Sequence, residues 1–272
     1  MRKSRILLPL LALSLLCACA APAAGPTPAQ EPSPTVSVPP KDTPPAAGHV
    51  LTCRVVEGAE DGNLLLAGEN GEVYTLSTEQ LGGEPPALTD GMMVEVRYSG
   101  VTLETYPARF ADVSSVTAAD GGRDDRCGLY LQVLEDLWAV DPGLNDGITH
   151  LGVDLSGLTV LSESEKSAVA YAFGMAHGMF PLEATWDELV EEGYIDRENL
   201  IWEDGVLFSI ATDEDAVWSL PNLPVGAEPP VLTAFNAQKW RSGLGAYFFR
   251  DCIAQMSPDG DWSYSVGREA IS

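Results

Sequence analysis

Basic side chains are scarce in this chain of 272 residues. Fifteen Lys and Arg residues stand against 40 Asp and Glu residues, which gives a formal net charge of −25. A protein that binds the phosphate backbone of nucleic acid needs clustered Lys and Arg to displace counterions, and no stretch of this sequence supplies such a cluster. Nucleic acid is therefore excluded as the expected partner, and anionic lipid headgroups are a disfavoured docking surface for the same reason.

The apolar run near the N-terminus is too short for a transmembrane helix. Residues 6–16 form a run of 11 residues after Arg2, Lys3 and Arg5, whereas a helix needs about 20 apolar residues to cross the bilayer core. A basic stretch followed by a short apolar core is typical of a secretory signal peptide. We expect residues 1–18 to be that signal.

The end of this run predicts a lipid anchor. The sequence Leu16-Cys17-Ala18-Cys19 resembles the lipobox of bacterial lipoproteins, in which a small residue precedes the lipidated cysteine. The resemblance implies that Cys19 carries the lipid and that the protein is held on the cell membrane, facing outside the cytoplasm. The alternative is an ordinary secretory signal cut after a small-x-small site such as Ala18-Cys19-Ala20.

Residues 19–47 are expected to be a disordered, Pro-rich linker after the lipidated cysteine. Nine of the 27 residues from Ala21 to Ala47 are proline, and large apolar side chains are nearly missing. Proline removes backbone donors and favours the extended polyproline II conformation, so this composition predicts a semi-rigid spacer.

Residues 48–119 show the alternation and the turn dipeptides of short strands. Asn70-Gly71 and Asp90-Gly91 are typical of tight hairpins. About 70 residues in five or six strands predict a small antiparallel β-barrel, closed or nearly closed. The expected strands are residues 50–56, 63–67, 72–76, 92–98, 101–104 and 110–116.

The stretches Asp90-Gly91-Met92-Met93-Val94-Glu95-Val96 and Gly100-Val101-Thr102-Leu103-Glu104-Thr105-Tyr106-Pro107-Ala108 are similar to barrels of the oligonucleotide/oligosaccharide-binding (OB) fold in secreted proteins of Firmicutes. The resemblance covers about a quarter of the chain. Arg54, Arg97 and Arg109 oppose eleven acidic residues between His49 and Ala119, which argues against nucleic-acid binding by this barrel.

Residues 120–272 show helical patterns first and strand patterns afterwards. Asp124 or Asp125 is expected to cap a first helix, and the spacings Ser162 to Glu165 and Thr185 to Glu188 predict capping boxes for two more. The later strands are expected at residues 200–202, 206–211, 231–240, 244–256 and 261–271. This order predicts an α+β domain with helices on one face of an antiparallel sheet.

The runs Gly128-Leu129-Tyr130-Leu131-Gln132-Val133-Leu134-Glu135-Asp136-Leu137-Trp138, Gly143-Leu144-Asn145-Asp146-Gly147-Ile148 and Lys239-Trp240-Arg241-Ser242-Gly243-Leu244-Gly245-Ala246-Tyr247 resemble those of clostridial lipoproteins and membrane-tethered extracellular domains with no assigned activity. This resemblance covers most of the second half of the chain and implies no catalytic residue.

Catalytic and metal-binding motifs are missing from the sequence. The histidines His49, His150 and His177 are far apart, and the chain has no His-Glu-x-x-His, Gly-x-Ser-x-Gly or Gly-Lys-Ser/Thr motif. Cys53, Cys127 and Cys252 have no zinc-like spacing; they are expected to be buried apolar residues, with a disulfide between the last two as the alternative. We therefore predict no catalytic residue, no metal site and no cofactor.

Two groups of side chains remain to be considered for ligand binding. The aromatic residues Trp240, Tyr247, Trp262 and Tyr264 are candidates for a peptide or glycan groove, unless they are sheet core. The abundant carboxylates are expected to be solvated surface charges. The sequence as a whole predicts a non-catalytic binding or interaction module at the cell envelope, with an envelope protein, peptide or glycan as partner. The alternatives are a carboxylate-dependent hydrolase acting on glycan or peptide, and a calcium-dependent adhesion or sensing domain.

Overall fold

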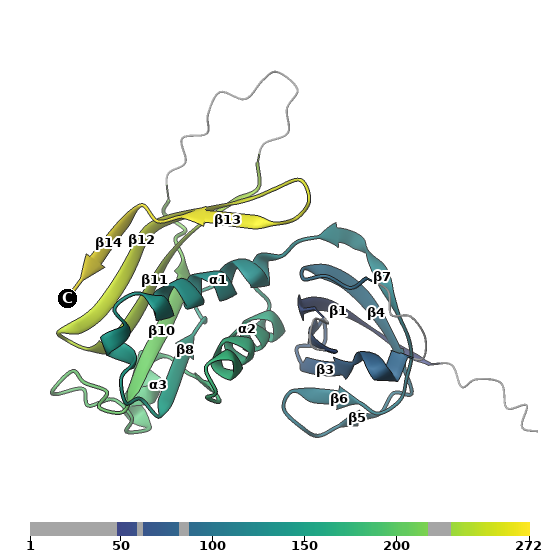
Figure 1. The fold of residues 1–272 in the computed structure, drawn as a ribbon, viewed down its shortest axis with the longest axis horizontal. Helices are drawn as coiled ribbons and strands as arrows, with labels where there is room; N and C mark the ends of the chain where they lie inside the picture. The colour runs from purple at the N-terminus through teal and green to yellow at the C-terminus, as the bar shows by residue number, and fades with distance from the viewer. Residues whose placement is uncertain (1–47, 59–61, 82–86, 217–229) are drawn as a thin grey trace, which may run out of the picture. The chain divides into compact units, whose positions relative to one another are not determined.

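The computed structural model describes residues 48–58, 62–81, 87–216 and 230–272. The predicted signal peptide, the predicted lipidation site Cys19 and the whole of the predicted Pro-rich linker lie outside these residues. The described part is a mixed α+β structure with two sheets (Figure 1). No helix within it is long and apolar enough to cross a membrane.

The first sheet contains seven strands among the described residues, in the order β5-β6-β3-β2-β1-β4-β7. Gly71 and Gly91 adopt positive φ angles, as the two predicted hairpin turns require. The strands are β1 (His49–Glu57), β2 (Asn63–Gly68), β3 (Val73–Ser77), β4 (Met92–Tyr98), β5 (Thr102–Leu103), β6 (Ala108–Phe110) and β7 (Val113–Arg123), with the 3-10 turn η2 (Thr78–Leu81) after β3.

The structure shows no closed barrel in this described region. Closure requires the two end strands to pair, and β5, at one end of the path, has two residues and so offers few backbone groups for pairing with β7 at the other end. The sheet is also not purely antiparallel, because β3 and β6 run parallel, with Tyr74 opposite Ala108.

The second sheet has the order β13-β12-β11-β10-β8-β9, with β14 paired to β12. Its elements are α1 (Arg126–Ala139), η3 (Pro142–Asn145), β8 (His150–Asp154), α2 (Glu163–Ala176), β9 (Leu182–Glu183), α3 (Trp186–Glu191), β10 (Gly205–Thr212), β11 (Leu232–Ser242), β12 (Gly245–Met256), β13 (Trp262–Ser265) and β14 (Arg268–Ile271).

The prediction of an antiparallel second sheet is wrong for two of the strand pairings. β8 runs parallel to β9 and to β10, because α2 is a crossover connection that returns the chain in the same direction. The prediction of helices on one face is also incomplete. α1 and α2 pack on the face that carries Phe208, whereas Leu189 of α3 packs with Leu207 on the opposite face.

The predicted helix starts are confirmed. Asp125 is the N-cap of α1 and accepts a hydrogen bond from the Gly128 amide at 3.2 Å. Both predicted capping boxes are present, Ser162 with Glu165 in α2 and Thr185 with Glu188 in α3. Each box satisfies backbone donors that the first turn of a helix leaves without a partner.

The main hydrophobic core joins the first sheet to the helices and the second sheet. Val56, Leu65, Ala67 and Val73 of the first sheet belong to the same buried cluster as α1, α2 and the α1-facing side of the second sheet. A separate buried cluster, including Tyr74, fills the other side of the first sheet. The first sheet therefore contributes to two cores, one of which it shares with the rest of the described chain.

Candidate functional site

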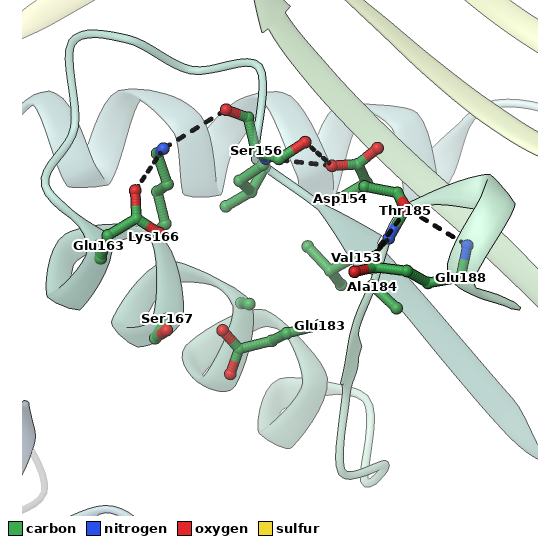
Figure 2. Close-up of a pocket in the computed structure, with 12 residues that line it drawn as sticks. Val153, Asp154, Ser156, Glu163, Lys166, Ser167, Glu183, Ala184, Thr185 and Glu188 are labelled. Atoms are coloured by element: carbon green, nitrogen blue, oxygen red, sulfur yellow. Dashed lines mark hydrogen bonds and ion pairs between the residues drawn. The ribbon is translucent and has the colours of Figure 1, made fainter. Parts of the chain in front are cut away.

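One small pocket lies at the carboxyl ends of the parallel strands β8 and β9, a position where ligands bind in many α/β sheets. Figure 2 shows its polar side chains bonded to one another: Lys166 Nζ lies 2.8 Å from Glu163 Oε1, and the Asp154 carboxylate accepts from the Ser156 hydroxyl at 2.6 Å. The volume is about 140 Å³, whereas ligand pockets hold about 300 Å³ or more. We therefore do not regard it as the functional site.

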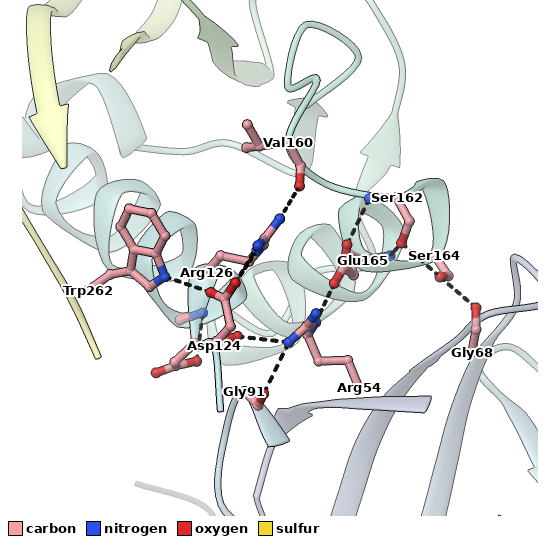
Figure 3. A network of polar contacts seen from close by, with 12 residues as sticks. Arg54, Gly68, Gly91, Asp124, Arg126, Val160, Ser162, Ser164, Glu165 and Trp262 are labelled. Carbon is pink, nitrogen blue, oxygen red and sulfur yellow. Dashed lines mark hydrogen bonds and ion pairs between the residues drawn. The ribbon is translucent and has the colours of Figure 1, made fainter. Parts of the chain in front are cut away.

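A network of charged side chains joins β1 to the first turns of α1 and α2 (Figure 3). Arg54 of β1 donates from Nε to Glu165 Oε1 at 2.5 Å and from Nη1 to the carbonyl oxygen of Asp124 at 3.0 Å. Trp262 Nε1 donates to Asp124 Oδ1 at 2.7 Å. A largely buried ion pair that is also hydrogen-bonded to backbone holds its elements at fixed positions.

Next to this network lies a larger cavity, the acidic groove, with a volume of about 560 Å³. It is bounded by the end of β1, the turn before β4, residues 128–135 of α1, and β13 with its preceding turn. Its carboxylates come from these separate segments: Glu57, Asp90, Asp125, Glu135 and Asp261. No Lys or Arg is among the described residues that line it.

Two of the predicted aromatic residues, Trp262 and Tyr264, line the acidic groove from β13. Both are fixed by hydrogen bonds to carboxylates, Trp262 to Asp124, which precedes α1, and the Tyr264 hydroxyl to Asp136 of α1. Burial and the bond to Asp136 raise the pKa of Tyr264, so its hydroxyl stays protonated and donates. The groove thus has a rigid aromatic wall beside its carboxylates.

The carboxyl group of Asp125 in the acidic groove has a raised pKa. Burial and the negative charge of Asp90 raise its pKa to about 6, although the Gly128 amide and Arg123 act in the opposite direction. Its neighbour Asp90 accepts from the Gly58 amide at 2.5 Å. A carboxyl group with a raised pKa in a cavity is a common feature of functional sites, and of structural charge clusters as well.

The guanidinium group of Arg123 is bound by residues from several segments that border the acidic groove. It contacts Asp261 Oδ1 at 2.5 Å and Asp125 Oδ2 at 3.6 Å, and its Nε donates to the Asp90 carbonyl oxygen at 2.7 Å. Three segments that border the groove therefore converge on one basic side chain. The remaining carboxylates, Glu57 and Glu135, lie along the lining of the same cavity.

Glu135 is held from outside the groove by His177, the C-cap residue of α2. His177 Nε2 lies 3.1 Å from Glu135 Oε1, and its ring stacks on Trp138 with a centroid distance of 3.8 Å. The contact orients the Glu135 carboxylate, and it also ties the end of α2 to the middle of α1.

The other two predicted aromatic residues lie elsewhere. Trp240 packs against Trp186 on the face of the second sheet that α3 covers. Tyr247 is on the α1 side, and its hydroxyl donates to Glu269 of β14. Side chains alternate between the two faces of a strand, so the four aromatic residues do not form one groove.

The three cysteines that the structure describes are buried and unpaired. Burial raises the pKa of the Cys53 and Cys252 thiols to about 12 and that of Cys127 well above its usual range. They are inert packing residues, as predicted, and the alternative disulfide between Cys127 and Cys252 is not formed. A search of the described residues for three or more His, Cys, Asp or Glu placed to hold a metal ion finds none.

Comparison with known proteins gives no relative. Protein-family models, curated proteins and solved structures were all searched, and none of them matches this chain. The function is therefore inferred from the residues alone.

Sequence reasoning missed the acidic groove, although it named two of its aromatic residues. Asp90, Asp125 and Asp261 are spread over more than 170 residues of sequence and look there like ordinary surface charges. One signal was available: Asp90 and Asp261 both sit in Gly-containing turns, next to Gly91 and Gly260, and such turns position polar side chains at the ends of strands.

Proposed function

We propose that this chain is a lipid-anchored, extracytoplasmic binding module of the cell envelope that holds a cationic ligand in the acidic groove. The observation that carries the proposal is one cavity that combines five carboxylates with the aromatic wall of Trp262 and Tyr264. An ammonium or guanidinium group pairs with carboxylates, and the aliphatic stem of Lys or Arg packs on aromatic rings. A basic peptide segment of an envelope protein fits this chemistry best.

A peptide titration tests the groove. We expect Ac-Lys-Leu-Lys-NH₂ to bind with an affinity that falls as salt rises, and Ac-Glu-Leu-Glu-NH₂ not to bind. D125N keeps the helix cap and removes a groove charge, so it should weaken binding about three- to ten-fold. The matched control is D187N, which removes an exposed carboxylate outside the groove. Equal affinity for both peptides, or equal loss in both variants, contradicts the proposal.

The anchor is tested separately. C19A should move the protein from the membrane fraction to the soluble envelope fraction, because roughly 0.8 kcal/mol of membrane affinity per acyl methylene is lost. Membrane association that persists in C19A contradicts lipidation at this residue.

A second candidate function is a carboxylate-dependent hydrolase that acts on envelope glycan or peptide. The observation that favours it is Asp125, a carboxyl group with a raised pKa that shares a cavity with other carboxylates, as in enzymes that pair a proton donor with a carboxylate. Release of dye from labelled peptidoglycan by the wild-type protein and not by D125N would favour the hydrolase over the binding module.

The OB-like character of the first sheet is part of this proposal. It is supported by the five-stranded path β6-β3-β2-β1-β4, since OB folds are partly open barrels of about five strands. In this reading the sheet serves as a scaffold, and its ligand-binding edge is the end of β1 and the turn before β4.

A further inference from the structure

Three aromatic rings from separate segments gather on the surface, away from the acidic groove. Tyr106 follows β5, Tyr171 is in α2, and Phe180 lies between α2 and β9. The ring of Tyr106 is 5.7 Å from each of the other two rings, and Tyr171 is 6.2 Å from Phe180, measured between centroids. We call these three residues the aromatic platform.

Two members of the platform are exposed although their rings are large, and Tyr171 between them is half-buried. The accessible fraction is 60% for Phe180 and 47% for Tyr106. The Tyr106 ring is nevertheless fixed, because its hydroxyl donates to Glu183 Oε1 at 2.9 Å. Burial of this hydroxyl and the charge of Glu183 raise the pKa of Tyr106, so the hydroxyl remains a donor. A fixed and exposed ring offers binding surface at little cost in conformational entropy.

A pocket of about 310 Å³ adjoins the platform at Tyr106. It shares no lining residue with the acidic groove. Besides Tyr106, its hydrogen-bonding side chains are three hydroxyls and two carboxylates, which belong to Thr102, Thr105, Ser167, Glu72 and Glu104. The Glu72 carboxylate accepts from the Tyr74 hydroxyl at 2.7 Å and keeps further lone pairs for a ligand.

We propose that the aromatic platform and this pocket bind a neutral oligosaccharide. A sugar ring has a face of C–H groups that packs on an aromatic ring, and hydroxyls around its edge that donate to carboxylates. Both requirements are met within one pocket here. An apolar peptide segment would bury the Glu72 and Glu104 carboxylates without supplying donors for their lone pairs, which is costly. An anionic glycan would be repelled by Glu72 and Glu104.

The proposal is tested by calorimetric titration of the full chain with chitotriose and cellotriose. We expect saturable binding of at least one of them, weakened about ten-fold or more in F180A and in Y106A. Y106F keeps the ring and loses the bond to Glu183, so its loss should be smaller. The matched control is L244A, which removes an exposed apolar side chain, 92% accessible, at the turn between β11 and β12; it should keep wild-type affinity.

Three outcomes would overturn the proposal. One is that neither sugar binds up to its solubility limit. The second is that both sugars bind F180A and Y106A, each with an unchanged thermal melt, as well as they bind the wild type. The third is that the wild-type protein self-associates through this surface and F180A does not, which would assign the platform to a protein interface. D125N should leave sugar binding unchanged, so this test is independent of the acidic groove.

Discussion

The carboxyl group of Asp125 has two effects that oppose each other. As the N-cap of α1 it accepts a backbone hydrogen bond, which stabilises the helix. As a buried acid beside Asp90 it carries a charge that the folded state disfavours, and its pKa is raised to about 6. The folded state therefore holds a proton in the window from about pH 4 to 6 that the unfolded state has released, and the free energy of unfolding falls as pH rises through this window.

The first prediction follows from this pH dependence of the free energy of unfolding. D125N keeps the cap, because Asn caps as well as Asp, and abolishes the charge. We expect D125N to raise the free energy of unfolding by about 2 kcal/mol near pH 7 and to have no effect near pH 3.5. Urea denaturation at the two pH values measures it. A D125N protein that is less stable than the wild type at about pH 7 would show that the Arg123 contact outweighs the repulsion.

Lys239 is a second buried charge, and it closes the C-terminal end of α1. Its ammonium group donates to the carbonyl oxygens of Leu137, Trp138, Val140 and Asp141 at 2.7 to 3.3 Å. Burial lowers its pKa to about 8, and the charge of Asp141 acts in the opposite direction. The last carbonyl oxygens of a helix have no donors within the helix. The Lys239 side chain, which extends from β11, supplies hydrogen-bond donors to them.

The second prediction concerns this contact. K239M keeps most of the side-chain volume and leaves several carbonyl oxygens without donors, so we expect a loss of about 2 to 4 kcal/mol in the free energy of unfolding. R197A, which breaks an exposed ion pair with Asp187, is the control and should change stability little. Similar denaturation curves for K239M and wild type would mean that water molecules donate to these carbonyl oxygens in place of the ammonium group.

At the scale of elements, the two capping boxes differ in one respect. Glu165 of α2 accepts from the Ser162 amide at 2.8 Å and also pairs with Arg54. The carboxylate of Glu188 in α3, in contrast, accepts hydrogen bonds from Thr185 of its own box. The first box therefore links a helix start to the first sheet, and the second is local.

The third prediction compares these boxes. E165A should cost about 3 kcal/mol, because it removes a cap and leaves the partly buried Arg54 without its ion partner. E188A should cost clearly less. Thermal unfolding of the two variants side by side measures the difference, and equal losses would show that the pair with Arg54 adds nothing to the cap.

Helix starts were predictable from the sequence because capping is local. The spacing of Ser162 and Glu165 is visible in four residues, and hairpin turns such as Asn70-Gly71 are equally short signals. β8 and β9 were missed for the opposite reason. They are short, β9 has two residues, and parallel pairing joins segments that a helix separates, so nothing local marks them.

The candidate site was predictable only in part. Trp262 and Tyr264 stand two residues apart on β13 and therefore share a face, which the sequence allowed one to expect. The position of Trp240 relative to Tyr247 could not be predicted without the register of β11 and β12. Tyr247 pairs with Lys239, whereas Trp240 pairs with Ala246, so Trp240 and Tyr247 lie on opposite faces of the sheet. The carboxylates of the groove meet only through tertiary packing of β1, α1 and β13.

At the scale of the whole molecule, the shared core predicts that the two sheets unfold together. Val56 and Leu65 of the first sheet are buried in the same cluster as Phe173 of α2, and Arg54 adds an ion pair across the same contact. Removing either sheet would expose the apolar face of the other, which is costly in water.

The fourth prediction tests this cooperativity. Trp138, Trp186, Trp202, Trp240 and Trp262 are the tryptophans among the described residues, and all of them belong to the second sheet, its helices or its loops. Their fluorescence therefore reports this part of the chain, whereas hydrogen exchange of β1 and β4 amides reports the first sheet. The two probes should give one coincident transition in urea. An earlier loss of protection in β1 and β4 would show that the first sheet is a separate unit of folding.

The acidic groove has a further consequence for the lifetime of the protein. Its walls come from β1, the turn before β4, α1 and β13, so the cavity exists only while all of these segments are in place. A ligand that occupies it has no counterpart site in the unfolded chain, and a hundred-fold excess over its dissociation constant lowers the unfolded population by about the same factor. Proteases that digest unfolded chains would then remove empty copies first, and the amount of the protein would follow the supply of ligand.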